Sequence, residues 1–346
     1  MKLHLFNPDN DLALAADLEY YTPSKAAVAL RRSGSLLPWL WADDGDMILV
    51  AEDMLSGAED WCRSKRLSVK PVVASPAMAE ASPWGWSKAA RRAFLNAGVA
   101  AECLPDDSRL ATWRNISHRR STILIHNMLG LTPPVEVFSA EEALEEVNRL
   151  GGRAMVKLPW SSSGRGVWPT AGIAQPKFMA RVSGEINHAG SVMIEPWRYK
   201  IIDFAALYVV KSGVAEFAGL SLFKTSQSGA YSGNIVMGDR KISDYLGIDA
   251  TAIASEMTGC LDNLLEGSGY SGMIGVDMMT YRDDNGNLTV EPCVEINLRS
   301  TMGFAALALN RRHNIEGEMI VVPGALPPGY EPLVPGEKFA IGVRKF

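Results

Sequence analysis

Short apolar runs separated by longer mixed segments characterise the N-terminal third of the chain. The runs have the length of buried strands and lie at residues 2–6, 47–52 and 69–74. Hydrophobic residues recur at helical spacing over residues 12–21 and, after an initial loop, over residues 81–98. Strands that alternate with helices indicate parallel pairing. We therefore predict a small parallel sheet with helices on its faces.

Two further helices are predicted in the middle of the chain. Residues 117–129 form the first of them, and Ser117 has the side chain of an N-cap. Residues 140–152 form the second. Ser139 precedes this helix and Glu142 follows three residues later, which is the spacing of a capping box.

Strand-like runs dominate the remaining sequence. They lie at residues 154–160, 191–197, 203–210, 214–223, 272–282 and 288–299. The last two are joined by Asp-Asp-Asn-Gly-Asn at residues 283–287, and Asn-Gly is a strong signal for a hairpin turn. The last four runs therefore predict an antiparallel sheet.

Composition and charge exclude several classes of protein. Of 346 residues, 47% are hydrophobic and 21% are charged, which is typical of a globular protein of two or three domains. The net charge of −5 argues against a nucleic-acid-binding surface. No apolar segment approaches the ~20 residues that span a bilayer, and polar residues interrupt the first apolar run, so no signal peptide is expected. The four cysteines form no Cys-x-x-Cys pair, so we expect reduced thiols in a cytoplasmic protein.

The run Glu-Ile-Asn-Leu-Arg, residues 295–299, carries the most informative chemistry. Side chains two residues apart on a strand point to the same side, so Glu295 and Asn297 could reach one hard cation, with Arg299 on the same face. The predicted hairpin brings Asp277 to the neighbouring strand. Oxygen ligands beside an arginine suit phosphoryl chemistry. Taken alone, the pattern is also that of an ordinary polar strand face.

A glycine-rich segment follows the predicted strand that contains Lys157. A lysine on a strand can act as a point charge beside phosphate oxygens. Small residues after it allow backbone N–H groups to approach phosphates closely, but glycine-rich loops of this kind are also common turns. The segment consists of Ser161, Ser162, Ser163, Gly164, Arg165 and Gly166.

The order of these motifs resembles the ATP-grasp superfamily over residues 116–310. In that family a basic residue near the start of a helix contacts the ATP phosphates, and Arg119 matches it, with Arg120 as the adjacent alternative. The segment from Lys157 to Val167 resembles the second basic motif. The alternative for the Arg119–Arg120 pair is a solvated basic patch on a helix.

Residues 193–197 resemble the hinge of the same family, where the adenine base binds. The resemblance assigns Glu195 to the adenine amino group and the backbone N–H of Trp197 to the ring, since Pro196 lacks an N–H. Asp203 is the candidate for the ribose hydroxyls. A charged residue at the start of a strand is the alternative interpretation of Asp203.

The resemblance also implies a fold, cofactors and a reaction. The fold class is α/β, and α+β overall, with an N-terminal parallel α/β domain before a two-subdomain ATP-grasp fold that contains an antiparallel sheet. Asp277, Glu295 and Asn297 would bind Mg²⁺, or Mn²⁺, and Arg299 and Lys157 would be catalytic. The protein would use ATP to activate a small carboxylate for attack by an amine or similar nucleophile. A kinase that leaves the phosphoryl group on its substrate, and a non-catalytic ATP-binding protein, are the alternatives.

Two polar segments are candidates for substrate binding. The first follows the first strand and contains Asn7, Asp9, Asn10 and Asp11, at a place where α/β sheets often bind ligands. Its alternative role is to cap the next helix. The second is the predicted loop 224–234, with Lys224 and Tyr231, which is otherwise a plain mobile loop.

The motifs divide the chain into four expected parts. These are an N-terminal domain at 1–115, an ATP-grasp subdomain with the glycine-rich loop at 116–197, a second subdomain with the catalytic strand at 198–310, and a C-terminal extension at 311–346.

Overall fold

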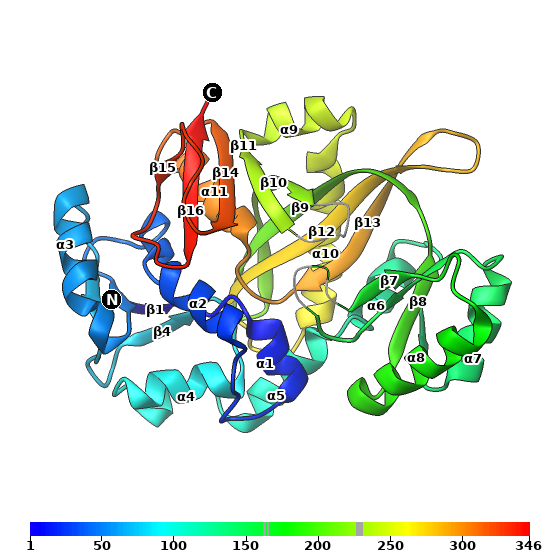
Figure 1. Ribbon diagram of the computed structural model, residues 1–346, viewed down its shortest axis with the longest axis horizontal. Coiled ribbons are helices and arrows are strands. Elements are labelled where there is room, and N and C mark those ends of the chain that lie inside the picture. The colour runs from blue at the N-terminus through cyan, green and yellow to red at the C-terminus, as the bar shows by residue number, and fades with distance from the viewer. Residues whose placement is uncertain (162–163, 165, 226–230) are drawn as a thin grey trace.

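The computed structural model describes residues 1–161, 164, 166–225 and 231–346 (Figure 1). Figure 1 shows a parallel sheet at one end of the molecule, a small sheet with two helices at the other, and a large sheet between them. No helix in the described ranges is long and apolar enough to cross a membrane.

The N-terminal sheet is parallel, as predicted, and has the strand order β3-β2-β1-β4. Its strands are β1 (Lys2–Leu5), β2 (Met47–Leu49), β3 (Lys70–Val72) and β4 (Glu80–Pro83). Its helices are α1 (Asn10–Ala16), α2 (Lys25–Ser33), α3 (Leu55–Lys65) and α4 (Lys88–Asn96), with short 3-10 turns at Leu37–Leu40, Glu52–Met54 and Ala101–Cys103.

Two predicted helices in this region are too long. The segment at 81–98 begins as strand β4, which pairs with β1, and α4 starts only after Ser87, whose hydroxyl accepts a hydrogen bond from the Ala90 N–H at 3.2 Å. The helix predicted at 12–21 ends early because Asp17 adopts a left-handed conformation with φ 51°.

The start of the helix predicted at 117–129 is also corrected. A helix that the pattern did not reveal, α5 (Asp107–Ile116), precedes it, and the Asp106 carboxylate caps α5 by accepting from the Arg109 N–H at 2.8 Å. Ser117 follows the last residue of α5, and its hydroxyl donates back to the Trp113 carbonyl at 2.8 Å. The next helix, α6, therefore begins later and spans Ser121–Met128.

The small sheet has the antiparallel order β5-β8-β6-β7. Its strands are β5 (Val135–Val137), β6 (Ala154–Lys157), β7 (Val167–Pro169) and β8 (Val192–Pro196), and its helices are α7 (Ala140–Arg149) and α8 (Gln175–Ala189). The capping box of α7 is confirmed. The Ser139 hydroxyl accepts from the Glu142 N–H at 3.1 Å, and the Glu142 carboxylate accepts from the Phe138 N–H at 2.8 Å.

The large sheet is antiparallel and eight-stranded, with the order β13-β12-β9-β10-β11-β14-β16-β15. Its strands are β9 (Tyr199–Lys211), β10 (Val214–Thr225), β11 (Tyr231–Val236), β12 (Gly272–Arg282), β13 (Leu288–Asn297), β14 (Gly317–Pro323), β15 (Glu331–Pro332) and β16 (Phe339–Lys345). The helices α9 (Asp239–Leu246) and α10 (Ala250–Leu265) share the core on one face. The helix α11 (Met302–Arg311) packs on the other through Phe304.

Two expectations about this sheet change. Tyr231 lies in strand β11, so the segment predicted as a loop at 224–234 is strand at both ends, and residues 226–230 lie outside the described part. Residues 311–346 supply β14, β15 and β16 to the same sheet.

Residues of the C-terminal segment also bind the N-terminal region through hydrogen bonds and hydrophobic packing. The Ser33 hydroxyl at the end of α2 accepts hydrogen bonds from three consecutive backbone N–H groups, those of residues 337–339. The Trp39 indole donates to the Leu333 carbonyl at 2.8 Å. Phe6 and Ile341 lie in one hydrophobic cluster, so residues from the two ends of the sequence share a core.

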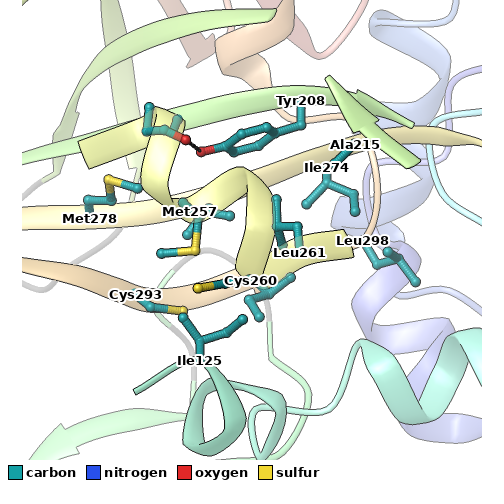
Figure 2. Close-up of a cluster of buried hydrophobic side chains, with 14 of the residues drawn as sticks. Ile125, Tyr208, Ala215, Met257, Cys260, Leu261, Ile274, Met278, Cys293 and Leu298 are labelled. Carbon is teal, nitrogen blue, oxygen red and sulfur yellow. Dashed lines mark hydrogen bonds between the residues drawn. The ribbon is translucent and has the colours of Figure 1, made fainter. Parts of the chain in front are cut away.

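The core between the large sheet and α10 contains one notable polar contact. The Tyr208 hydroxyl donates to the Ala254 carbonyl at 2.7 Å, as Figure 2 shows, among apolar side chains such as Met257 and Ile274. Burial raises the pKa of Tyr208 well above its usual range. The hydroxyl is therefore a permanent donor, and it ties the helix to strand β9.

Replacing Tyr208 by Phe keeps the ring and removes the donor. The free energy of unfolding should fall by about 1 kcal/mol, because the buried Ala254 carbonyl loses a partner that water does not replace. Urea denaturation measures this change. Tyr245→Phe is the matched control, since Tyr245 is 62% exposed. Equal losses in both variants would contradict a stabilising role for the buried bond.

Candidate active site

The register of β12 and β13 brings the acidic residues of the site together. Asp277 lies directly opposite Glu295, and Gly275 lies opposite Asn297. Residues that face each other across an antiparallel pair point to the same side of the sheet. Asp277, Glu295 and Asn297 therefore share one face, which is also the face covered by α11.

The negative charges of the two facing carboxylates, Asp277 and Glu295, repel each other. Burial raises the pKa of Asp277 to about 7, and the neighbouring charge of Glu295 adds to the rise, while Arg299 and a hydrogen bond from Asn297 oppose it. A divalent cation would relieve the repulsion, and carboxylate and amide oxygens are the donors that magnesium prefers. The described residues contain no cluster of three or more histidine, cysteine or acidic side chains that could hold a metal.

Arg119 lies at this acidic pair. Its guanidinium contacts the Glu295 carboxylate at 2.7 Å and donates to the Leu158 carbonyl at 3.1 Å. The side chain is buried, and its Nε atom has no hydrogen-bond partner among the described residues. Arg120, the adjacent alternative, is half exposed and pairs with Glu136 instead. Of the two arginines, the structure thus brings Arg119 to the site.

Lys157 connects the small sheet to the large one. Its buried ammonium forms an ion pair with Glu195 on the neighbouring strand β8, and it lies 3.5 Å from the Val294 carbonyl of β13. A cation from one sheet therefore lies beside the strand that carries the acids of the other. This places Lys157 and Arg119 on the side of the small sheet that faces Glu295.

The described part of the glycine-rich segment has the backbone that such a loop needs. Gly164 and Gly166 have φ values of 73° and 77°, in the left-handed region that favours glycine. A Cβ on Gly166 would lie 2.7 Å from the Leu158 side chain, so a larger residue does not fit there. Ser161 is buried. The remaining predicted residues lie outside the described part: Ser162, Ser163 and Arg165.

The hinge borders a small cavity of about 20 Å³ between the two sheets. Glu195, Pro196 and Met279 are among its lining residues. The Trp197 N–H, which the sequence assigned to a nucleotide base, donates to the Arg153 carbonyl at 3.2 Å. The Arg153 guanidinium also stacks 4.6 Å above the Trp197 ring. This amide is therefore engaged within the protein.

A histidine and a glutamate that the sequence did not reveal line the same cavity. His126 Nε2 lies 2.7 Å from the Glu291 carboxylate, and Nδ1 lies 2.7 Å from the Thr122 carbonyl. Only an imidazolium can donate to an acceptor from both nitrogens. Burial works to lower the pKa of His126, but Glu291 outweighs it and the pKa is raised. Glu291 lies opposite Met279 of β12, but the register shifts between this pair and Asp277–Glu295, so the two-residue strand period alone did not identify Glu291.

The His126–Glu291 pair makes stability depend on pH. Because the pKa is raised on folding, the contribution is fully present below the unfolded value of about 6.5 and is lost as pH rises through the folded value. The difference in melting temperature between wild type and His126→Gln should therefore be largest near pH 6 and shrink towards pH 9. Thermal unfolding across this range measures it. The exposed His188, changed to Gln, is the control, and a constant difference for His126→Gln would contradict the ion pair.

Arg299 leaves the strand that carries the acids. Strand β13 ends at Asn297, so Arg299 does not continue the alternating face as the pattern predicted. Its guanidinium contacts the Asp11 carboxylate of α1 at 2.6 and 2.9 Å. Burial works to lower the pKa of Arg299, but the surrounding acids, Asp11 first, raise it.

Asn7 and Asp9 of the N-terminal turn have partners of their own, whereas the buried Nδ2 of Asn10 has none among the described residues. Asn7 donates to the Gly85 carbonyl at 2.8 Å, and Asp9 pairs with Arg31 at 2.9 Å. Asn10 is completely buried. The turn is thus packed inside the protein.

The remaining candidates lie along β9, β10 and β11. The Asp203 carboxylate accepts from the Lys200 ammonium at 2.6 Å and from the Thr225 hydroxyl at 2.8 Å. Lys224 pairs with Glu318 of β14 at 2.7 Å, away from the acidic pair of β12 and β13. The Tyr231 hydroxyl donates to the Asn234 side chain at 2.5 Å, which makes it part of a buried polar network.

Comparison with known proteins identifies the fold. No family model matches the sequence, and no curated protein sequence matches it. Among solved structures, N5-carboxyaminoimidazole synthetase from Staphylococcus aureus with ADP aligns at a TM-score of 0.53 and 13% identity, over 88% of this chain and 94% of that one. The N5-carboxyaminoimidazole synthase of Aspergillus clavatus with ADP and 5-aminoimidazole ribonucleotide aligns at 0.50 and 12%, over 89% and 94%.

A third structure, the ADP complex of an N5-carboxyaminoimidazole ribonucleotide synthetase, aligns over the whole of this chain and 91% of its own, at a TM-score of 0.50 and 12% identity. These enzymes belong to the ATP-grasp superfamily. The chain therefore has the ATP-grasp fold, and the predicted fold class is confirmed. At such low identity the likeness establishes the fold alone.

Proposed function

We propose that the protein is an ATP-dependent ligase that activates a small carboxylate as an acyl phosphate for attack by an amine or a similar nucleophile. The observation that carries the proposal is the meeting of Asp277 and Glu295 with the two buried cations Arg119 and Lys157. Arg119 contacts the Glu295 carboxylate, and Lys157 lies beside the backbone of the same strand at Val294. Solved structures of this fold include synthetases that bind ADP.

The nucleotide would bind between the two sheets. Arg119 and Lys157 are each held by an acid, and phosphate oxygens would take the place of those acids as partners. The glycines of the loop would let backbone N–H groups approach the phosphates. The hinge cavity beside Glu195 and Pro196 lies where the base would enter, although it must widen to admit one.

The acidic set fits magnesium, and Mn²⁺ accepts the same oxygen donors. Asp277, Glu295 and Asn297 would hold the ion, which would neutralise phosphate charge and so allow an anionic carboxylate to approach ATP. When it binds, Arg119 must release Glu295 and turn to the phosphates. The protein thus exchanges internal ion pairs for contacts with its substrates.

The reaction would proceed in two displacements. A carboxylate oxygen attacks the γ-phosphorus of ATP, the bond to the bridging oxygen breaks, and ADP leaves. The nucleophile then attacks the acyl carbon, the bond to phosphate breaks, and the nucleophile loses its proton. Arg299, whose side chain is 14% exposed, would stabilise the negative charge that develops at each step as a fixed donor.

Glu295→Gln tests the metal set. The variant should lower ATP turnover by at least roughly a hundredfold, because it removes one of two ligand charges that act in the transition state. ADP release with pools of small acids and amino acids measures turnover, and thermal unfolding verifies the fold. The exposed Glu216, changed to Gln, is the control. Unchanged turnover in Glu295→Gln would exclude the proposed metal site.

Isotope scrambling separates a ligase from a kinase. With the acid present and no amine, a ligase should phosphorylate its substrate reversibly in the closed site, so label at the β–γ bridge of ATP moves to non-bridging positions. Arg299→Met should lose scrambling while ATP still raises its melting temperature, since Lys157 and the metal ligands remain. A phosphorylated product that survives dialysis, formed without a second substrate, would establish a kinase instead.

A further inference from the structure

Arg299, the proposed catalytic arginine, is held by hydrogen bonds to Asp11 of the N-terminal turn. Asp11, the second residue of α1, accepts from Arg299 Nε at 2.9 Å and from Nη2 at 2.6 Å. The third nitrogen, Nη1, donates to the Ser300 carbonyl at 3.0 Å. Both side chains of the pair are more than four-fifths buried, with exposures of 14% and 12%. Every nitrogen of the guanidinium therefore has a fixed direction.

Hydrogen bonds also fix the backbone around the Asp11–Arg299 pair. Gly85 forms an isolated antiparallel bridge with Arg299, and the Ser300 N–H donates to the Trp84 carbonyl at 2.7 Å. The Asn7 side chain bonds the Gly85 backbone in both directions, at 2.8 and 3.3 Å. A Cβ on Gly85 would lie 2.9 Å from the Cβ of Arg299, so the two segments touch as closely as glycine permits.

Three acids compete for this one arginine. Glu295 lies on the strand that leads into Arg299, and Asp277 lies opposite it on β12, yet the hydrogen bonds of the guanidinium go to Asp11. Without Asp11, the long side chain would be free to turn towards the two acids of the metal set. An arginine bound there would occupy ligands that the cation needs.

We infer that Asp11 is a positioning residue, which aims Arg299 at the reacting groups and keeps it away from Asp277 and Glu295. The inference rests on the proposed function for the first part only. Fixing the guanidinium beforehand removes the need to reorganise it during the reaction, which is the main advantage of a preorganised donor. Asp11 is thereby assigned to the arginine rather than to a substrate.

The N-terminal turn provides a matched control. Asp9 belongs to the same turn, is also buried and also pairs with an arginine, but that arginine is Arg31. Asp9→Asn and Asp11→Asn each remove one negative charge and one buried ion pair. Losses of stability should therefore be similar, while effects on turnover and on cation binding should differ.

The first test is a double-mutant cycle on turnover. Asp11→Asn should lower kcat roughly tenfold or more and change the KM for ATP by less than about twofold, whereas any effect of Asp9→Asn on kcat should be the same factor in the wild type and in an Arg299→Met background. In an Arg299→Met background, Asp11→Asn should add no further loss, because its effect passes through Arg299. An equal loss in both backgrounds would overturn the positioning role.

The second test needs no reaction. Binding of Mn²⁺ alone, followed by electron paramagnetic resonance, should be at least about fivefold weaker in Asp11→Asn than in Asp9→Asn, and the difference should vanish when Arg299 is Met. Unchanged Mn²⁺ affinity in Asp11→Asn would overturn the inference even if the wild type turns over ATP. If the wild type releases no ADP with any acid, the proposed function fails, and the Mn²⁺ cycle still decides whether Asp11 restrains Arg299.

Discussion

Two carboxylates held face to face on a sheet are the constraint around which the site is built. Pairing of β12 with β13 places Asp277 against Glu295. Backbone hydrogen bonds along both strands fix this register, so the side chains cannot separate to reduce their repulsion. Burial and the charge of Glu295 raise the pKa of Asp277 to about 7, and Arg119 pairs with the Glu295 carboxylate. The site is thus prepared for positive charge.

The cationic side chains of the site are likewise paired with charges of opposite sign. Arg119 is held by Glu295, Lys157 by Glu195 and Arg299 by Asp11. An unpaired charge in a buried site is unfavourable. A fold that places cationic side chains where phosphates would bind must therefore pair them with acids while no nucleotide is bound. The partners of Arg119 and Lys157 lie on strands β13 and β8, whereas the partner of Arg299 lies on helix α1 near the start of the chain. Only the first two pairs lie where a nucleotide would separate them, which is why we assign the third a lasting role.

Much of this arrangement was accessible from the sequence because it is local. The hairpin turn at 283–287 and the two-residue period of strands led to the pairing of Asp277 with Glu295 and to the shared face with Asn297. The two-residue strand period did not predict the position of Arg299, because β13 ends at Asn297 and the chain turns to meet Gly85. That turn depends on a contact between distant segments, which no local pattern contains.

Other differences had similar causes. Ser117 has the side chain of an N-cap, but a preceding helix ends there, and helix length is set by packing as well as by caps. His126 looks like any buried histidine until β13 brings Glu291 to it. In the same way, the partner of Lys157 follows from the pairing of β6 with β8. Residue types and strand period thus indicate which side chains take part, and tertiary structure decides which of them meet.

The pairing of Asp11 with Arg299 has a consequence for how the protein is made. These residues are 288 positions apart, and the N-terminal core also includes β16 near the end of the sequence. Contacts of such separation form late, since the chain must close a very long loop to make them. During synthesis the N-terminal sheet therefore leaves the ribosome long before the C-terminal strands that pack against it. A ribosome-bound intermediate that already contains the glycine-rich loop still lacks Arg299, so the candidate site is complete only when nearly all of the sequence has left the ribosome.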